Sequence, residues 1–395
     1  MHSWQLIFYI SCGLVFYNYA GYAAVVYLLN KLTGSRQSAD EDPDFRPTVA
    51  FIVAAFNEQD VIKQKIVNSL EQDYPTDKIE YIFVTDGSSD HTAEIVTQSP
   101  GIRLLHRPER GGKSAALNRA VAKATQDIII ASDANTLLNR EAVKNIVRHY
   151  RSEKTGGVAG EKKVLAAASG AEDVGAGEGL YWKYESALKK LDADFYSVVG
   201  AAGELFSLRR ELYEPLPDNV ILDDFVLSLR VTQKGYRVRY EPDAYAMELP
   251  SFSMKDEQKR KIRIAAGGFQ AIGMLPHLLA FWKYPRLTFL YVSHRVLRWT
   301  LSPLCLMLAL VANAFLLPAG PFYQLLFTAQ LLFYGVSFIA WRSPAIRDKV
   351  KLAKLAYYFT FMNLSVILGF FRFLRGGQSA TWEKAKRTLE PISGD

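Results

Sequence analysis

Cysteine is scarce in this chain, which has two cysteines among its 395 residues, Cys12 and Cys305. So few cysteines exclude a disulfide-rich scaffold, and the long apolar runs around both favour two buried thiols over a bridge. Hydrophobic residues make up 49% and charged residues 22%, which excludes a disordered or collagen-like chain. The length allows one large domain or two smaller ones, each with a full hydrophobic core.

A strong excess of one charge is also lacking. The chain has 47 Lys and Arg against 40 Asp and Glu, a formal net charge of +7. The basic residues gather beside hydrophobic runs, so the positive-inside rule of membrane proteins explains them more simply than nucleic-acid binding. We therefore expect membrane lipids, and no nucleic acid, among the partners.

The first long apolar run covers residues 4–29 and contains no charged side chain, so it could cross a bilayer as a helix. A secretory signal peptide would carry a basic segment ahead of the run. Only His2 precedes it, whereas Lys31 and Arg36 follow it. We predict an uncleaved anchor over residues 1–31 in the inner (plasma) membrane, with the chain that follows in the cytoplasm.

Three more apolar runs, residues 288–318, 322–341 and 356–371, predict a C-terminal membrane region over residues 288–375. The loop between the last two runs is basic, which favours a cytoplasmic position. The last run is short and a basic tail, residues 376–395, follows it. A full crossing and a re-entrant or interfacial hairpin both remain open, so the side that holds the C-terminus is not predicted.

Between residues 46 and 250, short β-rich runs alternate with helical segments. The runs at 47–55, 79–85 and 126–131 are typical of strands buried on both faces. The segments between and after them are helical in pattern, at residues 58–72, 92–97, 113–124 and 140–150. This alternation predicts an α/β fold with a mostly parallel sheet and right-handed crossovers. Ligands of such a sheet bind at the carboxyl ends of its strands.

Polar residues follow each predicted strand. Phe56-Asn57-Glu58 comes after the first, a turn that starts at Asp86 after the second, and Asp133-Ala134-Asn135 after the third. Each alone is also typical of a turn or a helix cap. Three such polar segments, one after each predicted strand, favour a shared crevice that binds a nucleotide. The oxygen ligands of Asp133 and Asn135 suit a divalent cation that bridges a diphosphate.

Residues 110–114, Arg-Gly-Gly-Lys-Ser, invite comparison with a phosphate-binding loop. That motif needs a glycine at the position of Arg107, and no strand immediately precedes it. Lys113 at the start of a helix can still contact an anion through its charge and the helix dipole.

Together these residues resemble the family 2 glycosyltransferases, in particular the membrane-integrated branch of hyaluronan, chitin, cellulose and poly-N-acetylglucosamine synthases. The resemblance covers residues 49–268 and implies a nucleotide-diphospho-sugar (GT-A-like) fold. It implies that Phe56, Asn57 and Glu58 border the base pocket, that Asp86 contacts the uracil or ribose, and that Lys113 of the Gly111–Asn118 segment lies near the donor. Asp133 and Asn135 fall on the D-x-D motif as ligands of Mg²⁺ or Mn²⁺, with an amide in place of the second acid.

Two later segments extend the resemblance. Residues 200–206 are similar to the glycine-rich acceptor-side segment, which places Gly203 and Glu204 beside the acceptor. Residues 221–230 align Asp224 with the catalytic base and Asp223 with the acid before it. A carboxylate near the acceptor hydroxyl would supply general-base catalysis of about 10²–10⁴-fold. An acidic pair at a helix N-terminus is the alternative explanation, and both can hold.

The Q-x-x-R-W motif of polymerising members is incomplete. Arg263 falls on its arginine, a diphosphate contact, while Arg260 and Ile264 stand at the glutamine and tryptophan positions. The missing tryptophan weighs against processive synthesis. We expect Arg260 and Arg263 to bind the donor, with snorkelling at the membrane surface as the alternative. Trp382 in the tail resembles a segment that folds back onto the acceptor side.

Two further clusters of basic residues lie next to the predicted membrane segments. Lys255, Lys259 and Lys261 of the same predicted helix are expected to face lipid rather than to act in catalysis. His294, Arg295 and Arg298 either line an acceptor path or anchor the chain at the interface.

The sequence thus predicts an N-terminal anchor, a cytoplasmic glycosyltransferase domain over residues 46–250, interfacial amphipathic helices over 251–287, and the membrane region and tail given above. The expected function is inverting transfer of a sugar from a UDP-sugar to a membrane-associated glycan or lipid acceptor, in envelope polysaccharide or glycolipid synthesis. A processive synthase that couples polymerisation to export, and a non-catalytic nucleotide-sugar-binding membrane subunit, are the alternatives. Partner subunits are not predicted.

Overall fold

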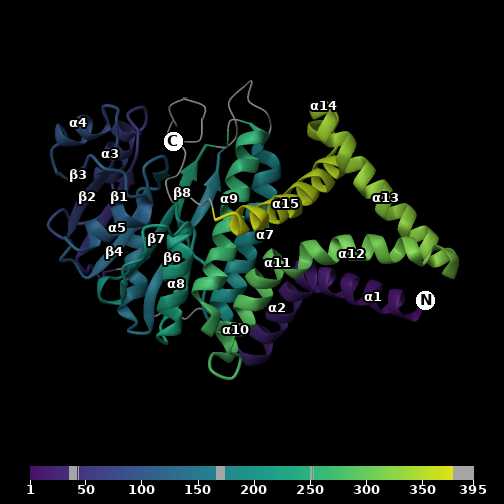
Figure 1. Ribbon diagram of the computed structural model, residues 1–395. Coiled ribbons are helices and arrows are strands. Elements are labelled where there is room, and N and C mark those ends of the chain that lie inside the picture. Colours follow the sequence, from purple (N-terminus) through teal and green to yellow (C-terminus); the bar gives the residue numbers. More distant parts are fainter. Residues whose placement is uncertain (35–41, 43, 166–173, 250, 252, 377–395) are drawn as a thin grey trace.

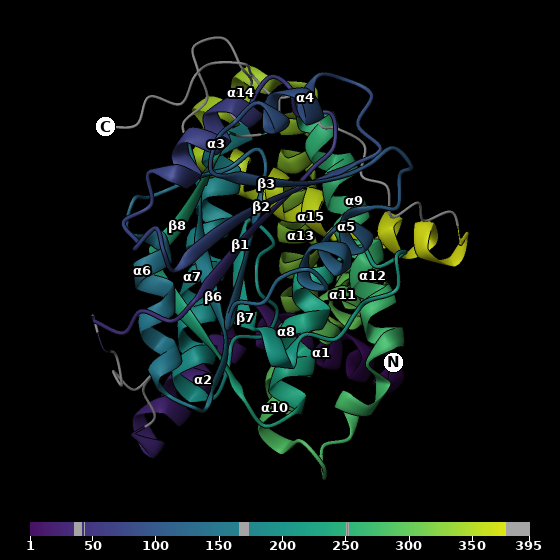
Figure 2. The same ribbon diagram turned by 90° about the vertical axis from the view of Figure 1, so that its left-hand side faces the viewer.

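The fold is described from a computed structural model, which places residues 1–34, 42, 44–165, 174–249, 251 and 253–376. The predicted acceptor-side residue Trp382 lies outside this part of the chain. A β-sheet with its covering helices forms one side of the molecule, and a group of long apolar helices forms the other (Figure 1). The view from the sheet side shows the same arrangement, with α12, α13 and α15 behind the strands (Figure 2).

One mixed sheet of eight strands organises the domain, in the order β3-β2-β1-β4-β7-β6-β8-β5. β1 pairs in parallel with β2 and β4, and β2 with β3, whereas β7 is antiparallel to both β4 and β6. The strands are β1 (Val49–Ala55), β2 (Ile79–Asp86), β3 (Ile102–Arg107), β4 (Ile128–Asp133), β5 (Leu137–Leu138), β6 (Thr155–Val164), β7 (Leu205–Arg209) and β8 (Arg237–Glu248). The mostly parallel α/β fold predicted from the sequence is confirmed.

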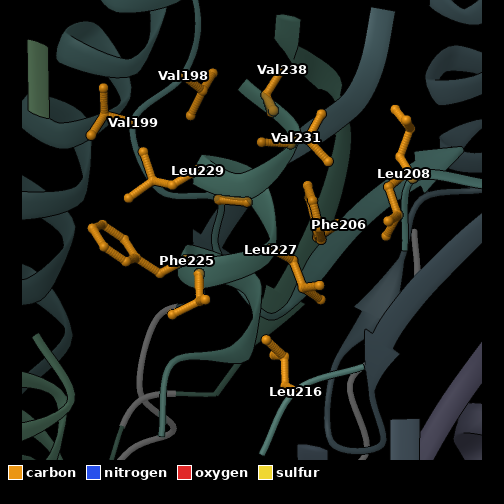
Figure 3. Packing of buried hydrophobic residues seen from close by; sticks show 14 of the residues in the cluster. Val198, Val199, Phe206, Leu208, Leu216, Phe225, Leu227, Leu229, Val231 and Val238 are labelled. Atoms are coloured by element: carbon orange, nitrogen blue, oxygen red, sulfur yellow. The ribbon is translucent and has the colours of Figure 1, made fainter. Parts of the chain in front are cut away.

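Helices cover both faces of the sheet because its central strands are apolar on both faces. One hydrophobic cluster joins β1 and β2 to α3, α4 and α6, and the other joins the opposite face to α5, α7 and α8. The helices of the domain are α3 (Ile62–Leu70), α4 (Thr92–Thr97), α5 (Lys113–Val121), α6 (Ala142–Val147), α7 (Val174–Phe195), α8 (Asp223–Gln233) and α9 (Met254–Met274). Figure 3 shows Leu227 and Val231 of α8 on the side of Phe206 of β7 and Val238 of β8, whereas Phe225 and Leu229 lie on the side of Val199.

The start of α8 is pressed against the preceding loop at Gly200. This glycine has φ +83°, and a Cβ atom there would lie 2.2 Å from Cδ2 of Phe225. Only glycine combines that backbone conformation with so close an approach. The contact fixes the first turn of α8, with Asp223 and Asp224, beside the loop that carries Gly203.

Three helices are long and apolar enough to span a membrane: His2–Thr33, Pro321–Arg342 and Lys351–Leu374. The run predicted over residues 288–318 is instead a pair of helices, Pro285–Trp299 and Leu301–Phe315, bent by 53°. These segments comprise α1 (His2–Phe16), α2 (Tyr22–Thr33), α10 (Pro285–Tyr291), α11 (Leu297–Trp299), α12 (Leu301–Phe315), α13 (Pro321–Arg342) and α15 (Lys351–Leu374). The short helix α14 (Pro344–Lys349) lies between α13 and α15. Pro303 lies in the first turn of α12, where its missing N–H costs no hydrogen bond.

The last of these helices, α15, lies against α9 rather than apart from the domain (Figure 1). A Cβ atom at Gly369 would lie 2.5 Å from Cβ of Ala265, so the two helices meet there at backbone distance. The ring of Phe269 packs on those of Phe370 and Phe373, with centroids 5.0 and 6.1 Å apart. The C-terminal end of α15 therefore packs on α9 of the sheet domain.

Candidate active site

A cavity of about 1400 Å³ opens at the carboxyl ends of β1 and β4. Most of the predicted site residues line it: Glu58, Lys113, Asp133, Asn135, Gly203, Glu204, Asp223, Asp224, Arg260 and Arg263. Phe56, Asn57 and Asp86 are not among the lining residues. The fold thus brings together residues that lie up to 205 positions apart in the chain, from Glu58 to Arg263.

Asp86 lies beneath the cavity wall and is 1% exposed. Its Oδ2 accepts hydrogen bonds from the backbone N–H groups of Gly112 at 2.6 Å and Gly111 at 3.0 Å. Its Oδ1 lies 3.6 Å from Nη1 of Arg119. The carboxylate therefore orders the Gly-Gly turn that leads into α5, and a contact with the nucleoside stays a prediction.

The turn after β1 is tied to the turn after β2. Asn57 has φ +53°, and its Oδ1 accepts a hydrogen bond from the N–H of Ser89 at 2.8 Å. The N–H of Glu58 donates to Oγ1 of Thr92 at 2.8 Å. The guanidinium of Arg110 stacks over the ring of Phe56, 3.6 Å from its centroid. These contacts build one rim of the cavity from two strand ends, as the parallel sheet predicts.

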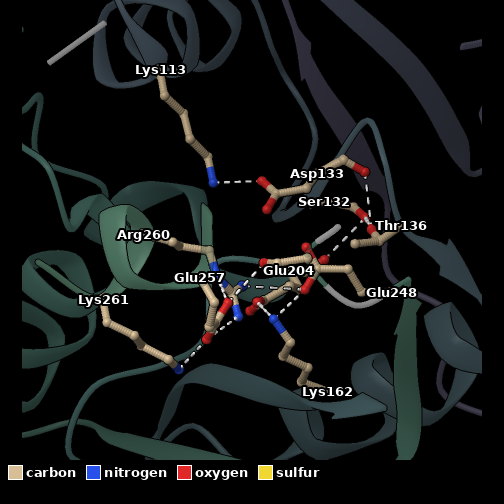
Figure 4. Close-up of polar contacts among 11 residues, drawn as sticks. Lys113, Ser132, Asp133, Thr136, Lys162, Glu204, Glu248, Glu257, Arg260 and Lys261 are labelled. Atoms are coloured by element: carbon tan, nitrogen blue, oxygen red, sulfur yellow. Dashed lines mark hydrogen bonds and ion pairs between the residues drawn. The ribbon is translucent and has the colours of Figure 1, made fainter. Parts of the chain in front are cut away.

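Lys113, the first residue of α5, meets Asp133 at the end of β4. Its Nζ donates to Oδ1 of Asp133 at 2.6 Å (Figure 4). Burial acts to lower the pKa of Lys113, but the carboxylates around it, Asp133 first, raise it above its ordinary value. Burial raises the pKa of Asp133 although Lys113 opposes the shift. The ion pair holds the ammonium group of Lys113 at a fixed position in the cavity lining.

Asp224 and Lys113 approach one another beside Gly203. A Cβ atom at Gly203 would lie 3.1 Å from Nζ of Lys113 and 3.5 Å from Cγ of Asp224, so glycine keeps this gap open. Burial raises the pKa of Asp224 to about 8, and the neighbouring charge of Asp223 acts in the same direction. A carboxyl with a pKa near neutrality can accept a proton during a reaction.

A chain of alternating charges runs from the cavity floor to α9 (Figure 4). Lys162 is buried and lies 2.6 Å from Glu204, and it also pairs with Glu248. Arg260 lies 3.5 Å from Glu248 and 3.0 Å from Glu257. These ion pairs hold α9 against the sheet. Arg260 is thereby paired with two carboxylates of its own chain.

Lys261 does not face lipid, contrary to the expectation from the sequence. It is 5% exposed and lies 3.2 Å from Oε1 of Glu257. Its ammonium group also lies 5.0 Å from the ring centroid of Tyr181. Arg263 points to the cavity instead of joining this network, and its Nε is buried without a hydrogen-bond partner in the described structure.

The basic residues of the bent helix pair with α7. Arg295 lies 2.9 Å from Oε2 of Glu185, Arg298 pairs with the same carboxylate, and Nδ1 of His294 lies 2.6 Å from Asp192. Arg295 and Glu185 line the cavity, whereas His294 is fully buried. These contacts join the membrane-type helices to the domain.

Buried lysines are the functional candidates that the sequence argument missed. Lys65 of α3 is fully buried and donates to Oγ of Ser132 at 2.7 Å and to the carbonyl of Thr136 at 2.9 Å, so it holds the loop that carries Asp133. Burial lowers its pKa to about 7. The sequence does contain a signal for this burial, because Lys65 lies three residues after Ile62 and so falls on the apolar face of the helix.

Lys189 of α7 is 2% exposed, and its Nζ has no hydrogen-bond partner in the described structure. Burial lowers its pKa. We expect Lys189→Met to stabilise the fold by about 1 kcal/mol, because a buried ammonium without a hydrogen bond is replaced by an apolar chain of similar length. Denaturant melts of the detergent-purified protein measure this, with the exposed Lys190→Met as control. A destabilised Lys189→Met would contradict the argument.

Oxygen-bearing side chains at the end of β4 suit a divalent cation. Asp133 and Asn135 offer carboxylate and amide oxygens, and the described residues contain no group of three or more His, Cys, Asp or Glu side chains that could hold a metal. Mg²⁺ is commonly bound by one or two carboxylates together with substrate phosphates and water. The residues therefore fit a cation that is bound together with a diphosphate.

The fold, together with a family match, defines a class of protein. Residues 50–216 match the model of glycosyl transferase family 2, so this part of the chain is a family 2 glycosyltransferase domain. The mannosyltransferase PcManGT from Pyrobaculum calidifontis, in a complex with GDP-Man and Mn²⁺, superposes with a TM-score of 0.73 at 23% identity. The match covers 94% of this chain and 99% of that one, and it shows the GT-A-like fold.

Curated relatives agree with this class. The probable glycosyltransferase YdaM of Bacillus subtilis (strain 168) is 29% identical over 261 residues, 61% of this chain and 59% of the relative. Poly-β-1,6-N-acetyl-D-glucosamine synthase of Staphylococcus aureus (strain MSSA476) is 25% identical over 251 residues, 60% of this chain and 59% of the relative. The chain thus matches about three fifths of the length of each of these relatives.

Proposed function

We propose that this chain is an inverting glycosyltransferase that moves a sugar from a UDP-sugar to a glycan or lipid acceptor held at the membrane, in envelope polysaccharide or glycolipid synthesis. One observation carries the proposal. The same cavity is lined by Lys113, Asp133 and Asp224 and by Met362 and Val366 of α15, a candidate membrane span. A donor bound at the sheet and an acceptor held by the membrane can therefore meet in one space.

The reaction is a direct displacement at the anomeric carbon. The acceptor oxygen bonds to that carbon, the bond from the carbon to the diphosphate oxygen breaks, and the proton of the acceptor hydroxyl passes to the carboxylate of Asp224. Lys113 and Arg263 stabilise the negative charge that develops on the diphosphate. When bound at Asp133 and Asn135, Mg²⁺ or Mn²⁺ supplies further positive charge to the same diphosphate.

The other predicted residues take supporting roles in this proposal. Phe56, Asn57 and Glu58 border the base, and Asp86 holds the turn before Lys113. Gly203 and Glu204 form the acceptor side, where the absence of a side chain at Gly203 leaves room for a sugar ring. Trp382 is proposed for the same side from its sequence alone.

The candidate membrane spans support insertion of this protein in the plasma membrane, with the sheet domain in the cytoplasm. The same division underlies the proposed domains, which are the anchor over residues 1–31, the catalytic domain over 46–250, the interfacial helices over 251–287, the membrane region over 288–375 and the tail over 376–395. The contact of α15 with α9 favours a C-terminus on the same side as the catalytic domain.

A processive synthase is the second candidate function, because the name of the Staphylococcus aureus relative describes a polymer synthase. Ile264 at the tryptophan position weighs against it. Product length separates the two candidates. A non-catalytic nucleotide-sugar-binding subunit would not need Asp224 beside the donor cation, and turnover would exclude it.

The donor is tested by release of the nucleoside diphosphate from a panel of UDP-sugars, with GDP-mannose as a further arm, in the presence of membranes and Mg²⁺ or Mn²⁺. The proposal predicts UDP release with one of the UDP-sugars. Release from GDP-mannose alone would keep the glycosyltransferase and overturn the UDP-sugar assignment.

The base assignment predicts a pH profile. Asp224 must be deprotonated to accept a proton, and its pKa is about 8 in the free protein. We expect kcat/KM to rise about tenfold per pH unit below pH 8 and to level off above it. In Asp223→Asn the neighbouring charge is lost, so the rise should move to lower pH. A flat profile between about pH 6 and pH 9 would contradict the assignment.

The metal assignment predicts a gain of affinity in Asn135→Asp. A second carboxylate binds a divalent cation more strongly than an amide oxygen. Half-maximal activity should therefore require about tenfold less Mg²⁺ or Mn²⁺. Asn219→Asp, at an exposed position in the loop before α8, is the matched control. An unchanged metal requirement in Asn135→Asp would show that this position is not a ligand.

A further inference from the structure

Five arginines line the cavity, and two of them, Arg260 and Arg295, pair with carboxylates as described above. The other three come from separate parts of the chain. Arg110 comes from the loop before α5, Arg263 from α9, and Arg372 from the last turn of α15. Arg110 stacks on Phe56, as described above. Arg372 has no assigned role, and it reaches the cavity from a helix with the composition of a membrane span.

Arg263 and Arg372 repel one another. Burial lowers the pKa of Arg263, and the positive charge of Arg372 acts in the same direction, whereas Asp223 raises it. Within the part of the chain that the structure places, neither arginine forms a salt bridge, and Nε of Arg263 is buried without a hydrogen bond. Two like charges at one cavity cost free energy unless an anion lies between them. The pair therefore indicates a binding site for an anion.

The position of Arg372 is fixed by the packing of α15. Met362, Ser365, Val366 and Arg372 line the cavity, and with Gly369 they recur every three or four residues, which places them on one face of the helix. Gly369 lies one turn before Arg372, and a Cβ atom there would lie 2.5 Å from Cβ of Ala265 and 3.0 Å from N of Ala266. The close approach of α15 to α9 thus determines how far the side chain of Arg372 extends into the cavity.

We propose that Arg372 binds the diphosphate of the nucleotide donor together with Arg263, so that the donor site is completed by the end of α15. The inference rests on the proposed function. Arginine suits this role because its planar group can bind phosphate oxygens through two parallel hydrogen bonds. Donor affinity then depends on the docking of α15 onto α9.

Calorimetry with the full-length protein in detergent tests the inference, with UDP and uridine as ligands and Mg²⁺ held constant. We expect Arg372→Ala to weaken UDP binding about 10- to 100-fold, as for loss of a hydrogen bond to a charged group, and to leave uridine binding unchanged. Arg372→Lys should regain part of the loss. The exposed Arg375→Ala, three residues further on, is the matched control.

A second pair of variants tests the role of helix packing. Gly369→Leu should weaken UDP binding to a similar degree, because the added side chain separates α15 from α9. Gly273→Leu, on α9, meets nothing within 4 Å of its Cβ position and should have no effect. Melting curves for all variants identify those that are not folded.

The outcomes separate this inference from the proposed function. Wild-type UDP binding in Arg372→Ala, or an equal loss of UDP and uridine, would overturn the role of Arg372 and leave the donor assignment intact. If the wild type binds no UDP, the comparison is made with GDP and guanosine. Binding of neither nucleotide by the wild type would overturn both proposals.

Discussion

Asp224→Asn should lower the rate of sugar transfer by about 10²–10⁴-fold, the usual contribution of a general base. The asparagine side chain has nearly the same shape but cannot accept the proton of the acceptor hydroxyl. UDP affinity should stay within about twofold of wild type, because the variant leaves Lys113, Asp133 and Arg263 in place. Initial rates of UDP release at saturating donor, with UDP affinity measured separately, give both quantities.

Asp218→Asn is the control for this experiment, because Asp218 is exposed in the loop that precedes α8. It makes the same chemical change five residues before Asp223 and should be as active as wild type. An Asp224→Asn protein that keeps more than about a tenth of wild-type activity would exclude Asp224 as the base. A protein that loses UDP binding instead would place Asp224 in the donor site.

Asp86→Ala should destabilise the domain by about 3 kcal/mol, because it leaves the N–H groups of Gly111 and Gly112 without their acceptor. The Asp86 carboxylate is 1% exposed, so water does not replace it readily. UDP binding should weaken as well, because the turn that sets the first residue of α5, Lys113, loses its anchor. Denaturant melts and calorimetry measure the two effects.

Asp218→Ala serves as the matched exposed control for Asp86→Ala and should change neither quantity. A stable Asp86→Ala protein that has lost UDP binding would assign Asp86 to direct contact with the nucleoside. A stable protein with wild-type affinity would contradict the role of Asp86 in the Gly-Gly turn.

The sequence predicted the core of the candidate site because the geometry of parallel sheets is simple. Carboxyl ends of neighbouring parallel strands meet at one edge, so the polar residues after β1 and β4 had to converge. Asp224 was placed by its resemblance to a family motif. The strand β3 was not predicted, because Ile102–Arg107 alternates little and lies at the sheet edge, with charged side chains exposed.

The charge network at the cavity floor could not be predicted. Lys162 meets Glu204 and Glu248 only because β6 and β8 pair in a particular register, and hydrophobic periodicity does not fix that register. The position of Arg260 between Glu248 and Glu257 likewise depends on how α9 packs on β8, which the sequence pattern does not give. Arg372 reaches the cavity through a helix contact at Gly369, which no local pattern of charge reveals.

The central claim is that this chain transfers a sugar to an acceptor held at the membrane. The most direct measurement incubates the purified protein with a radiolabelled UDP-sugar and native membranes and then follows the label. We expect label in a membrane-extractable product, with the anomeric configuration inverted, and about 10²–10⁴-fold slower labelling with Asp224→Asn. Label that appears only as free sugar or in a water-soluble product, or a product with retained configuration, would contradict the claim.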